Sequence, residues 1–365
     1  MRITEADVWE TASQVNQRSR NRYGGATRLD RVIVRLRDDA GNEGWGEAMP
    51  VSFTEETGAA DAVALREAAG KIAGREVEDP AAEVDRLADF GGLKAARTGL
   101  ETALLDLWAR ASGRPFSDAL GGERRDRFAL DGPIGLVSPE EAAEKAKGFL
   151  ASGISTLKVK AGQDLEADAR RLLSLREVFG DRIRLRTDAN GGYSADEAIQ
   201  FTNKILPAGI DHFEQPVLPS GEGCFDVFRE IRAMGIPIAV DESLFSLDDA
   251  ERLIAEDAVD VGVIKIAKFG GPLAAREVAR ALEAAGKACI LSSSYESHIG
   301  KSSGLALALS LENCDRAHEL GHFAPEEDFI RWRHDISGGV MSRREGTGLG
   351  AEGILDRMEA MTVPA

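Results

Sequence analysis

The first 120 residues divide into two regions by the spacing of their apolar side chains. Residues 1–50 alternate apolar and polar positions in three short runs, RITEADVWE, DRVIVRLRD and EGWGEAM, and the turn-forming sequence DAGN separates the last two. Residues 57–120 lack this alternation, and residues 98–110 have the apolar spacing of an amphipathic helix. The pattern predicts a small antiparallel sheet followed by helices, which together form an α+β domain.

From residue 127 onward, short apolar runs alternate with helical stretches. Strands that alternate with helices pair in parallel, and eight such runs over about 200 residues predict a (β/α) barrel. The alternative, an open doubly wound sheet, requires a glycine fingerprint after its first strand, which this chain lacks. The predicted strands are FALDGPIGL (128–136), TLKVKA (156–161), IRLRTDA (183–189), IDHFEQP (210–216), IPIAVDE (236–242), VDVGVIKIA (259–267), ACILSSS (288–294) and AHELG (317–321).

The C-terminal part does not continue this alternation. Its sequence SGGVMSRREGTGLG is rich in turn-forming residues and has no helical period. We expect this part to leave the barrel and to pack elsewhere, for example against the N-terminal domain.

The charge balance and the cysteines argue against several classes of protein. The 365 residues contain 45 Lys and Arg against 62 Asp and Glu, and the net charge of −17 repels nucleic-acid phosphates. No apolar run reaches the roughly 18 residues that a membrane span requires. The N-terminus lacks the apolar core of a signal peptide, so we expect a cytoplasmic protein with no membrane partner. The three cysteines are isolated, which argues against a disulfide framework or a zinc site.

Three of the predicted strands end in a carboxylate. Asp188, Glu214 and Asp241 terminate the third, fourth and fifth runs, 26 residues (188 to 214) and 27 residues (214 to 241) apart. Because the catalytic groups of a barrel gather where its strands end, we expect these carboxylates to converge. Their mutual repulsion favours a bound Mg²⁺, with Mn²⁺ as a substitute, because these cations prefer hard oxygen ligands. Taken singly, each residue is equally typical of a helix N-cap.

Lysines flank these carboxylates. Lys158 and Lys160 lie two residues apart on one strand and point to the same side, whereas Lys265 ends the sixth run, across the barrel. A buried lysine beside a dication and a second ammonium group is expected to have a lowered pKa and to act as a general base. This set predicts removal of an α-proton from a substrate carboxylate, with the metal stabilising the enediolate. Bases on two faces allow inversion of the stereocentre.

The ordered motifs of the chain resemble the enolase superfamily, specifically the muconate lactonizing enzyme subgroup of the mandelate racemase/muconate lactonizing enzyme family. The resemblance covers nearly the whole chain and implies an α/β fold, a (β/α)7β TIM-like barrel with an α+β capping domain. We therefore expect an N-terminal capping domain at 1–125, the barrel at 126–325 and a segment returning to the capping domain at 326–365. The motifs are GWGEA (44–48), LKVK (157–160), TDAN (187–190), FEQP (213–216), VDES (240–243), IKIAKFGG (264–271) and SSSYES (292–297).

The resemblance also implies roles for individual residues and a homo-oligomeric assembly. The matching positions are Asp188, Glu214 and Asp241 for the magnesium ligands, Lys160 and Lys265 for the two bases, Lys158 for the first lysine of the subgroup's KxK motif, and Asn190 and Glu296 for polar groups beside the site.

Enzymes of this subgroup catalyse several reactions with the same lysines, so the fold does not choose among them. Our leading hypothesis is an isomerase, a Mg²⁺-dependent racemase or epimerase acting on a small carboxylate, an amino-acid derivative. The alternatives are a muconate-type cycloisomerase or an o-succinylbenzoate synthase-like lyase, a non-catalytic metal-binding descendant, and a Schiff-base lyase. Dipeptide epimerases of the subgroup carry Asp-x-Asp on the last strand to hold the substrate ammonium, whereas this chain has only Glu319 there.

Substrate choice in the subgroup depends on loops of the capping domain, and two segments of this chain fit that role. Segment 16–28 carries Arg22 and Tyr23 among several arginines that suit a second anionic group, and segment 49–58 carries Phe53. His298, near the end of the seventh run, is a further candidate for substrate contact. The sequence Gly270–Gly271–Pro272 begins a helix and so has the chemistry of an anion site, although it is equally typical of a plain helix start.

Overall fold

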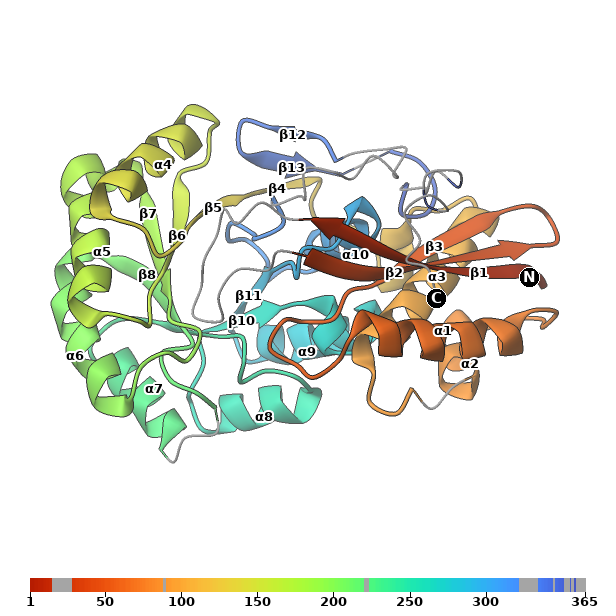
Figure 1. The fold of residues 1–365 in the computed structure, drawn as a ribbon, viewed down its shortest axis with the longest axis horizontal. Helices are drawn as coiled ribbons and strands as arrows, with labels where there is room; N and C mark the ends of the chain where they lie inside the picture. Colours follow the sequence, from red (N-terminus) through yellow and green to blue (C-terminus); the bar gives the residue numbers. More distant parts are fainter. Residues whose placement is uncertain are drawn as a thin grey trace.

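The computed structural model describes residues 1–14, 28–87, 90–219, 223–321, 334–343 and 345–350, together with residues 355 and 358. These residues form two lobes, one built on an N-terminal antiparallel sheet and the other on a parallel barrel (Figure 1). Most of the predicted specificity segment 16–28, with Arg22 and Tyr23, lies outside the described residues.

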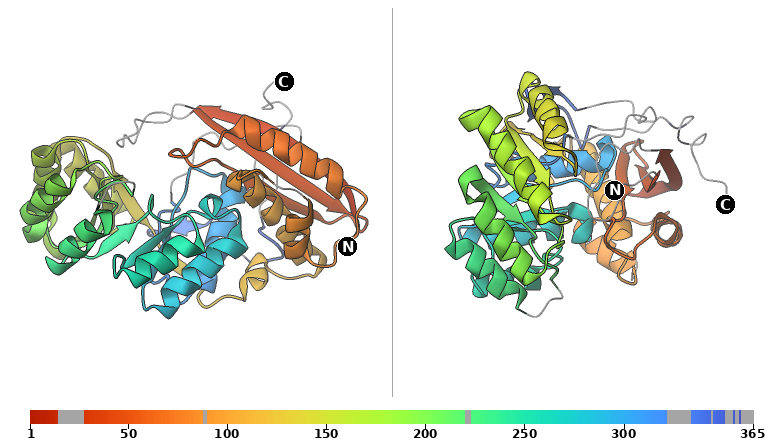
Figure 2. Two further views of the ribbon diagram at one scale, coloured as in Figure 1. Left: turned by 90° about the horizontal axis from the view of Figure 1, so that it is seen from below. Right: turned by 60° about the vertical axis from the view of Figure 1, so that its left-hand side comes forward.

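The N-terminal lobe has the predicted α+β composition. Strands β1 (Ile3–Gln14), β2 (Arg28–Asp38) and β3 (Glu43–Ala48) pair antiparallel in that order, and the DAGN sequence turns the chain between β2 and β3. The helices that follow are α1 (Gly58–Ile72), α2 (Pro80–Leu87) and α3 (Lys94–Ala111). Figure 2 shows α1 against the sheet and α3 between the sheet and the barrel. Helix α3 is thus the part of this lobe that meets the barrel.

The two glycines of GWGEA allow β3 and α3 to touch through their backbones. A Cβ atom at Gly46 would lie 1.9 Å from the carbonyl oxygen of Gly99, and one at Gly44 would lie 2.2 Å from that of Ala103. Neither position has room for a side chain, so the motif reflects close packing of strand on helix.

Seven parallel strands form the barrel in the order β11-β10-β9-β8-β7-β6-β5. The segment around His318 closes it, because Leu130 bridges to His318 on one edge and Ser292 to Glu319 on the other. The predicted (β/α)7β barrel is confirmed, although the eighth run makes only single bridges. The strands are β5 (Asp131–Ile134), β6 (Thr156–Lys160), β7 (Arg184–Asp188), β8 (Ile210–Glu214), β9 (Ile238–Val240), β10 (Val261–Ile264) and β11 (Ala288–Leu291).

Helices follow the barrel strands and cover the outside of the sheet (Figure 1). Among the described residues, no helix combines the length and the apolar composition needed to cross a bilayer. The three cysteines are buried and free. The helices are α4 (Pro139–Ala151), α5 (Leu165–Phe179), α6 (Ala195–Ile205), α7 (Cys224–Ala233), α8 (Leu247–Ala255), α9 (Pro272–Ala284) and α10 (His298–Ser310), with short 3-10 turns at Phe116–Leu120, Gly180–Arg182, Leu206–Ala208 and Ile266–Lys268.

The first predicted barrel run is two strands rather than one. Its start, β4 (Arg127–Ala129), pairs antiparallel with β13 (Val340–Ser342) of a C-terminal hairpin, whose other strand is β12 (Ile336–Ser337). The chain changes sheets at Leu130, whose N–H donates to Gly339 O at 2.8 Å, and it then continues as β5. The unbroken apolar pattern hides this change because both strands are partly buried.

In the described residues of the C-terminal part, strand β13 therefore pairs with β4 rather than with the sheet β1–β3. Contacts with the N-terminal lobe come later, where the Gly348 N–H donates to Arg114 O at 2.8 Å and the Leu349 N–H donates to Asp106 Oδ1 at 2.6 Å.

A buried polar cluster joins the two lobes. Arg31 and Glu47, both with fully buried side chains, come from the N-terminal sheet and form an ion pair at 3.4 Å. Arg31 donates from Nε and Nη2 to Tyr295 O at 3.1 and 2.8 Å. Glu47 accepts the Ser297 N–H at 2.9 Å and the Gly300 N–H at 3.0 Å. A carboxylate of the N-terminal lobe thereby caps helix α10 of the barrel.

Candidate active site

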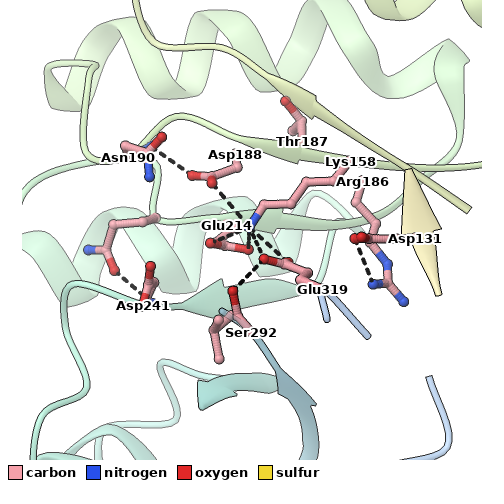
Figure 3. Close-up of polar contacts among 12 residues, drawn as sticks. Asp131, Lys158, Arg186, Thr187, Asp188, Asn190, Glu214, Asp241, Ser292 and Glu319 are labelled. Atoms are coloured by element: carbon pink, nitrogen blue, oxygen red, sulfur yellow. Dashed lines mark hydrogen bonds and ion pairs between the residues drawn. The ribbon is translucent and has the colours of Figure 1, made fainter. Parts of the chain in front are cut away.

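The three candidate metal ligands lie on neighbouring barrel strands. Asp188 and Glu214 end β7 and β8 and pair directly across the sheet, and Asp241 follows β9. All three side chains are buried. Figure 3 shows Asp188 and Glu214 around the ammonium group of Lys158, with Asp241 beside them. The structure thus brings the three predicted carboxylates to one end of the barrel.

Lys158, on β6, is the central cation of this cluster. Its Nζ lies 2.8 Å from Glu214 Oε1, 3.2 Å from Asp188 Oδ2 and 2.8 Å from Glu319 Oε1. Burial alone would lower the pKa of Lys158, but the charges of these carboxylates outweigh it and raise the pKa well above its ordinary value. The contacts with these carboxylates therefore favour the charged form of Lys158.

Lys160 ends β6, and 17% of its side chain is exposed. Its Nζ donates to Asp188 Oδ2 and, at 3.1 Å, to Asn190 Oδ1. The Asn190 N–H in turn donates to Asp188 Oδ1 at 2.8 Å. Asn190 has a φ of +48°, a left-handed conformation that turns the chain sharply just after Asp188. Asn190 thus contacts both a candidate base and a candidate ligand.

Lys265 lies on the opposite side of the cluster, directly after β10. Its Nζ is 2.6 Å from Asp241 Oδ2, and 13% of its side chain is exposed. The ring centroid of Phe53, from the N-terminal lobe, lies 4.8 Å from the same Nζ. Burial lowers the pKa of Lys265, but the charges of Asp241 and Glu242 outweigh it and raise the pKa above its ordinary value. The predicted lowering concerns a lysine beside a bound dication and stays a prediction, because in the arrangement described here the partners of Lys265 are carboxylates alone.

Lys268 is a member of the cluster that the sequence reasoning missed. Its fully buried Nζ donates to Asp241 Oδ1 at 2.7 Å, to Asp241 O at 2.8 Å and to Val263 O at 3.0 Å. The available signal was the second lysine of IKIAKFGG, three residues after Lys265. The 3-10 turn Ile266–Lys268 directs it inward, and strand periodicity cannot predict such a turn.

Gln215 was also missed, although it belongs to the FEQP motif. It has a φ of +39°, and its Oε1 accepts the N–H groups of Asp241 at 3.3 Å and Ser243 at 3.1 Å. Its Nε2 donates to Ser243 Oγ at 2.7 Å. Gln215 therefore fixes the chain that carries Asp241.

Glu319 lies on the segment that closes the barrel. Its two oxygens accept hydrogen bonds from Lys158 Nζ at 2.8 and 2.9 Å, and Oε2 also accepts one from Ser292 Oγ at 2.7 Å (Figure 3). Both oxygens of Glu319, which stands where dipeptide epimerases of the subgroup hold the substrate ammonium, are thus already engaged.

Glu296 and His298 have structural partners of their own. Glu296 accepts the Ser294 N–H at 2.8 Å and so shapes its own loop. His298 begins α10, is buried, and has its Nδ1 2.6 Å from Nδ1 of His334. The sequence spacing could not reveal this histidine pair, because His334 comes from the C-terminal segment.

The donor atoms of the cluster suit a hard divalent cation. Among the described residues, no three carboxyl or imidazole groups meet at one coordination point, because lysine ammonium groups lie against the carboxylates. Buried Glu214 Oε2 nevertheless accepts no hydrogen bond of good geometry, although Lys158 Nζ is 2.8 Å away. Burial and the charge of Asp188 raise the pKa of Glu214 well above its ordinary value, so a further cation at this position would stabilise the charged form of Glu214. Asp188, Glu214 and Asp241 are the residues that fit such a cation.

Two family descriptions match the chain over most of its length. The N-terminal domain of mandelate racemase/muconate lactonizing enzymes matches residues 14–121, and the enolase C-terminal domain matches residues 141–356. The chain belongs to the mandelate racemase/muconate lactonizing enzyme family. The predicted membership of the enolase superfamily and the capped-barrel fold are thereby confirmed.

Curated relatives of this family member are epimerases and racemases. It is 32% identical to the L-Ala-D/L-Glu epimerase of Bacillus subtilis, over 88% of this chain and 89% of the relative. It is 29% identical to the N-succinylamino acid racemase of Thermus thermophilus, over 100% and 98% of the two chains. The relatives support the predicted isomerase class.

Solved structures of the family share the whole fold. The muconate lactonizing enzyme of Pseudomonas putida superposes with a TM-score of 0.89, 25% identity and 99% coverage of both chains. A dipeptide epimerase from Cytophaga hutchinsonii, complexed with Mg and the dipeptide D-Ala-L-Val, gives a TM-score of 0.90 at 27% identity, over 99% and 98% of the chains.

Proposed function

We propose that this family member is a Mg²⁺-dependent racemase or epimerase that acts at the α-carbon of a small carboxylate, an amino-acid derivative. The observation that carries the proposal is the placement of Lys160 and Lys265. They lie on opposite sides of one cluster, each against a different carboxylate, Asp188 or Asp241. Two bases on opposite sides are what inversion of a stereocentre requires.

Each side chain of the cluster has a task in this proposal. Asp188, Glu214 and Asp241 hold the cation, which when bound supplies positive charge to the substrate carboxylate. One of the two lysines removes the α-proton from its face, and the other delivers a proton to the opposite face. Lys158 keeps its charge and offsets the negative charge that develops on the substrate. Mn²⁺ is the expected substitute metal, because it takes the same oxygen ligands.

We further propose that the substrate is an N-acyl amino acid that carries no free ammonium group. Glu319, the carboxylate available on the last segment of the barrel, is paired with the ammonium group of Lys158 and also accepts a hydrogen bond from Ser292. A free ammonium group would have to displace Lys158 from it, whereas an N-acyl group needs no such partner. Dipeptides, the substrates in the names of several relatives, form the second candidate class.

The experiment that tests the proposal is α-proton exchange in D₂O, read by mass spectrometry for both enantiomers of N-acyl amino acids and both epimers of dipeptides, with muconates screened beside them for a rearranged product. We expect each enantiomer of the true substrate to gain one deuterium. Lys160→Met should abolish exchange from one enantiomer and Lys265→Met from the other. Lys287→Met is a matched control, because its side chain is also 17% exposed but lies at the other end of the barrel, paired with Asp257.

Each outcome decides between the candidate functions. Equal exchange in both lysine variants would refute the two-base proposal. A single rearranged or dehydrated product formed without racemisation would instead support the cycloisomerase or lyase alternative.

A further inference from the structure

The turn that follows Lys265 is held by the N-terminal lobe. It contains Gly270 and Gly271, which precede helix α9, and helix α3 of the N-terminal lobe packs against it. On α3, Arg97 and Glu101 lie one helical turn apart and form an ion pair at 2.9 Å. Arg97 Nη1 donates to Gly270 O at 2.6 Å, and Glu101 Oε1 accepts the Leu273 N–H at 2.9 Å. The pair therefore contacts the turn on both its carbonyl and its amide side.

Glu101 of the N-terminal lobe caps the start of the barrel helix α9. Helix α9 has a glycine, Gly271, as its N-cap residue and no side-chain cap of its own. The carboxylate of Glu101 fills this role from the other lobe, with its side chain 1% exposed. The anion-binding chemistry that the sequence indicated at this helix start is thus satisfied within the chain.

Gly271 leaves room for the Glu101 carboxylate because it has no side chain. Its φ is +142°, and a Cβ atom there would lie 2.3 Å from Glu101 Oε1. The glycine pair that ends IKIAKFGG is therefore required by contact with the other lobe as well as by the local turn.

Lys160, the other candidate base, is held by contacts within the barrel. The Lys160 carbonyl oxygen accepts a hydrogen bond from Arg171 Nη1 at 2.9 Å, and Arg171 also donates to Asp168 Oδ1 at 3.0 Å. Asp168 Oδ2 accepts the N–H groups of Gly162 at 2.9 Å and Gln163 at 3.2 Å in the loop after Lys160. All of these anchors belong to the barrel.

We infer that Glu101, supported by Arg97, is a positioning residue for Lys265, whereas Asp168 and Arg171 position Lys160. This inference rests on the proposed function. Proton transfer by Lys265 then depends on contacts with the N-terminal lobe, whereas proton transfer by Lys160 depends, among the described residues, on the contacts of Asp168 and Arg171 within the barrel.

Enantiomer-specific exchange in D₂O tests this asymmetry on the full-length protein. The enantiomer that loses exchange in Lys265→Met defines the Lys265 half-reaction. We expect Glu101→Gln to slow that exchange at least tenfold and the other enantiomer's exchange less than twofold. Asp168→Asn should show the opposite selectivity. A loss of stability without a positioning role would slow both exchanges alike.

Two further variants make the test independent of how well Glu101→Gln folds. Arg97→Met removes the donor to Gly270 O and should reproduce the selective loss. Asp85→Asn removes only the exposed partner of the same arginine, at 2.7 Å from Nη2, and should leave both exchanges within twofold of the wild type. Equal slowing of both enantiomers, or of neither, in Glu101→Gln and Arg97→Met would overturn the inference while leaving the proposed function intact. Absence of exchange in the wild type would overturn both.

Discussion

Phe53 of the N-terminal lobe covers Lys265 of the barrel, with its ring centroid 4.8 Å from the lysine Nζ. The same ring packs edge-to-face against Phe245 at a centroid distance of 5.9 Å. A candidate base is thus shielded from water by a side chain from the other lobe.

We expect Phe53→Ala to lower kcat/KM about tenfold, which corresponds to about 1.4 kcal/mol of transition-state stabilisation. The reason is that water gains access to Lys265 and the cation–π contact is lost. Steady-state kinetics on the substrate identified by exchange measures the effect. Phe53→Leu, which keeps an apolar cover, should retain more activity than Phe53→Ala, and equal activity of the two would contradict this role.

The close approach of β3 and α3 predicts a strong effect of one methyl group. Gly46→Ala places a Cβ atom 1.9 Å from Gly99 O, and we expect the free energy of unfolding to fall by more than about 2 kcal/mol. Gly70→Ala is the control, because a Cβ there meets no atom within 4 Å in helix α1, and it should stabilise by about 0.5–1 kcal/mol. Urea unfolding measures both, and similar values for the two variants would refute this account of GWGEA.

The buried carboxyl group of Asp61 should make the free energy of unfolding depend on pH. Burial, a hydrogen bond to Glu56 and the charge of Glu56 raise its pKa from 3.8 to about 9. The folded protein therefore holds a proton that the unfolded chain releases above about pH 4. This contribution to stability is complete at low pH and is lost as the pH rises from 3.8 toward 9.

Asp61→Asn should remove that loss, because the amide is neutral at every pH and can still donate to Glu56. We expect the variant to match the wild type near pH 4 and to exceed it by more than about 1 kcal/mol near pH 8. Chemical unfolding across this range measures the difference. Asp181→Asn, which removes an exposed carboxylate, should show no such trend, and a parallel trend in both variants would contradict the assignment.

Binding of Mg²⁺ should stabilise the folded protein. At a free concentration 100 times Kd, the free energy of unfolding should rise by about 2.7 kcal/mol over the protein in EDTA. Glu214→Gln removes one proposed ligand and should abolish most of this gain, whereas Glu312→Gln, at an exposed position, should keep it. Thermal unfolding with and without the metal measures the gain, and an Mg²⁺-independent Tm in the wild type would count against the metal site.

The barrel strands and the carboxylates at their ends could be predicted from the sequence, because they recur once in every strand–helix unit. Asp188, Glu214 and Asp241 were predictable because each ends a buried run, and barrel geometry then brings such residues together. Lys268 and Gln215 were not, because a 3-10 turn and a left-handed residue direct them into the cluster, and neither has a periodic signature. The engagement of Glu319 by Lys158 was equally hidden, since it depends on two segments 161 residues apart.

The number of charges around each lysine was hidden from the sequence for a related reason. Sequence order shows that ammonium groups and carboxylates are neighbours, but not how many of each contact a given atom. Lys158 contacts three carboxylates, and their sum decides the sign of its shift. Contacts between the lobes, such as Glu101 with Leu273, also have no local pattern that a single sequence could reveal.

The ion pair of Arg31 and Glu47 has a consequence for how the molecule loses its structure. Its charges are fully buried only while the N-terminal sheet packs against the start of α10. Separating the lobes would break the hydrogen bonds that this pair makes with Tyr295, Ser297 and Gly300, and it would remove the cap from the start of α10. We therefore expect one cooperative calorimetric transition for the whole chain. The barrel, cut away from its N-terminal sheet, should not persist as an autonomous folding unit.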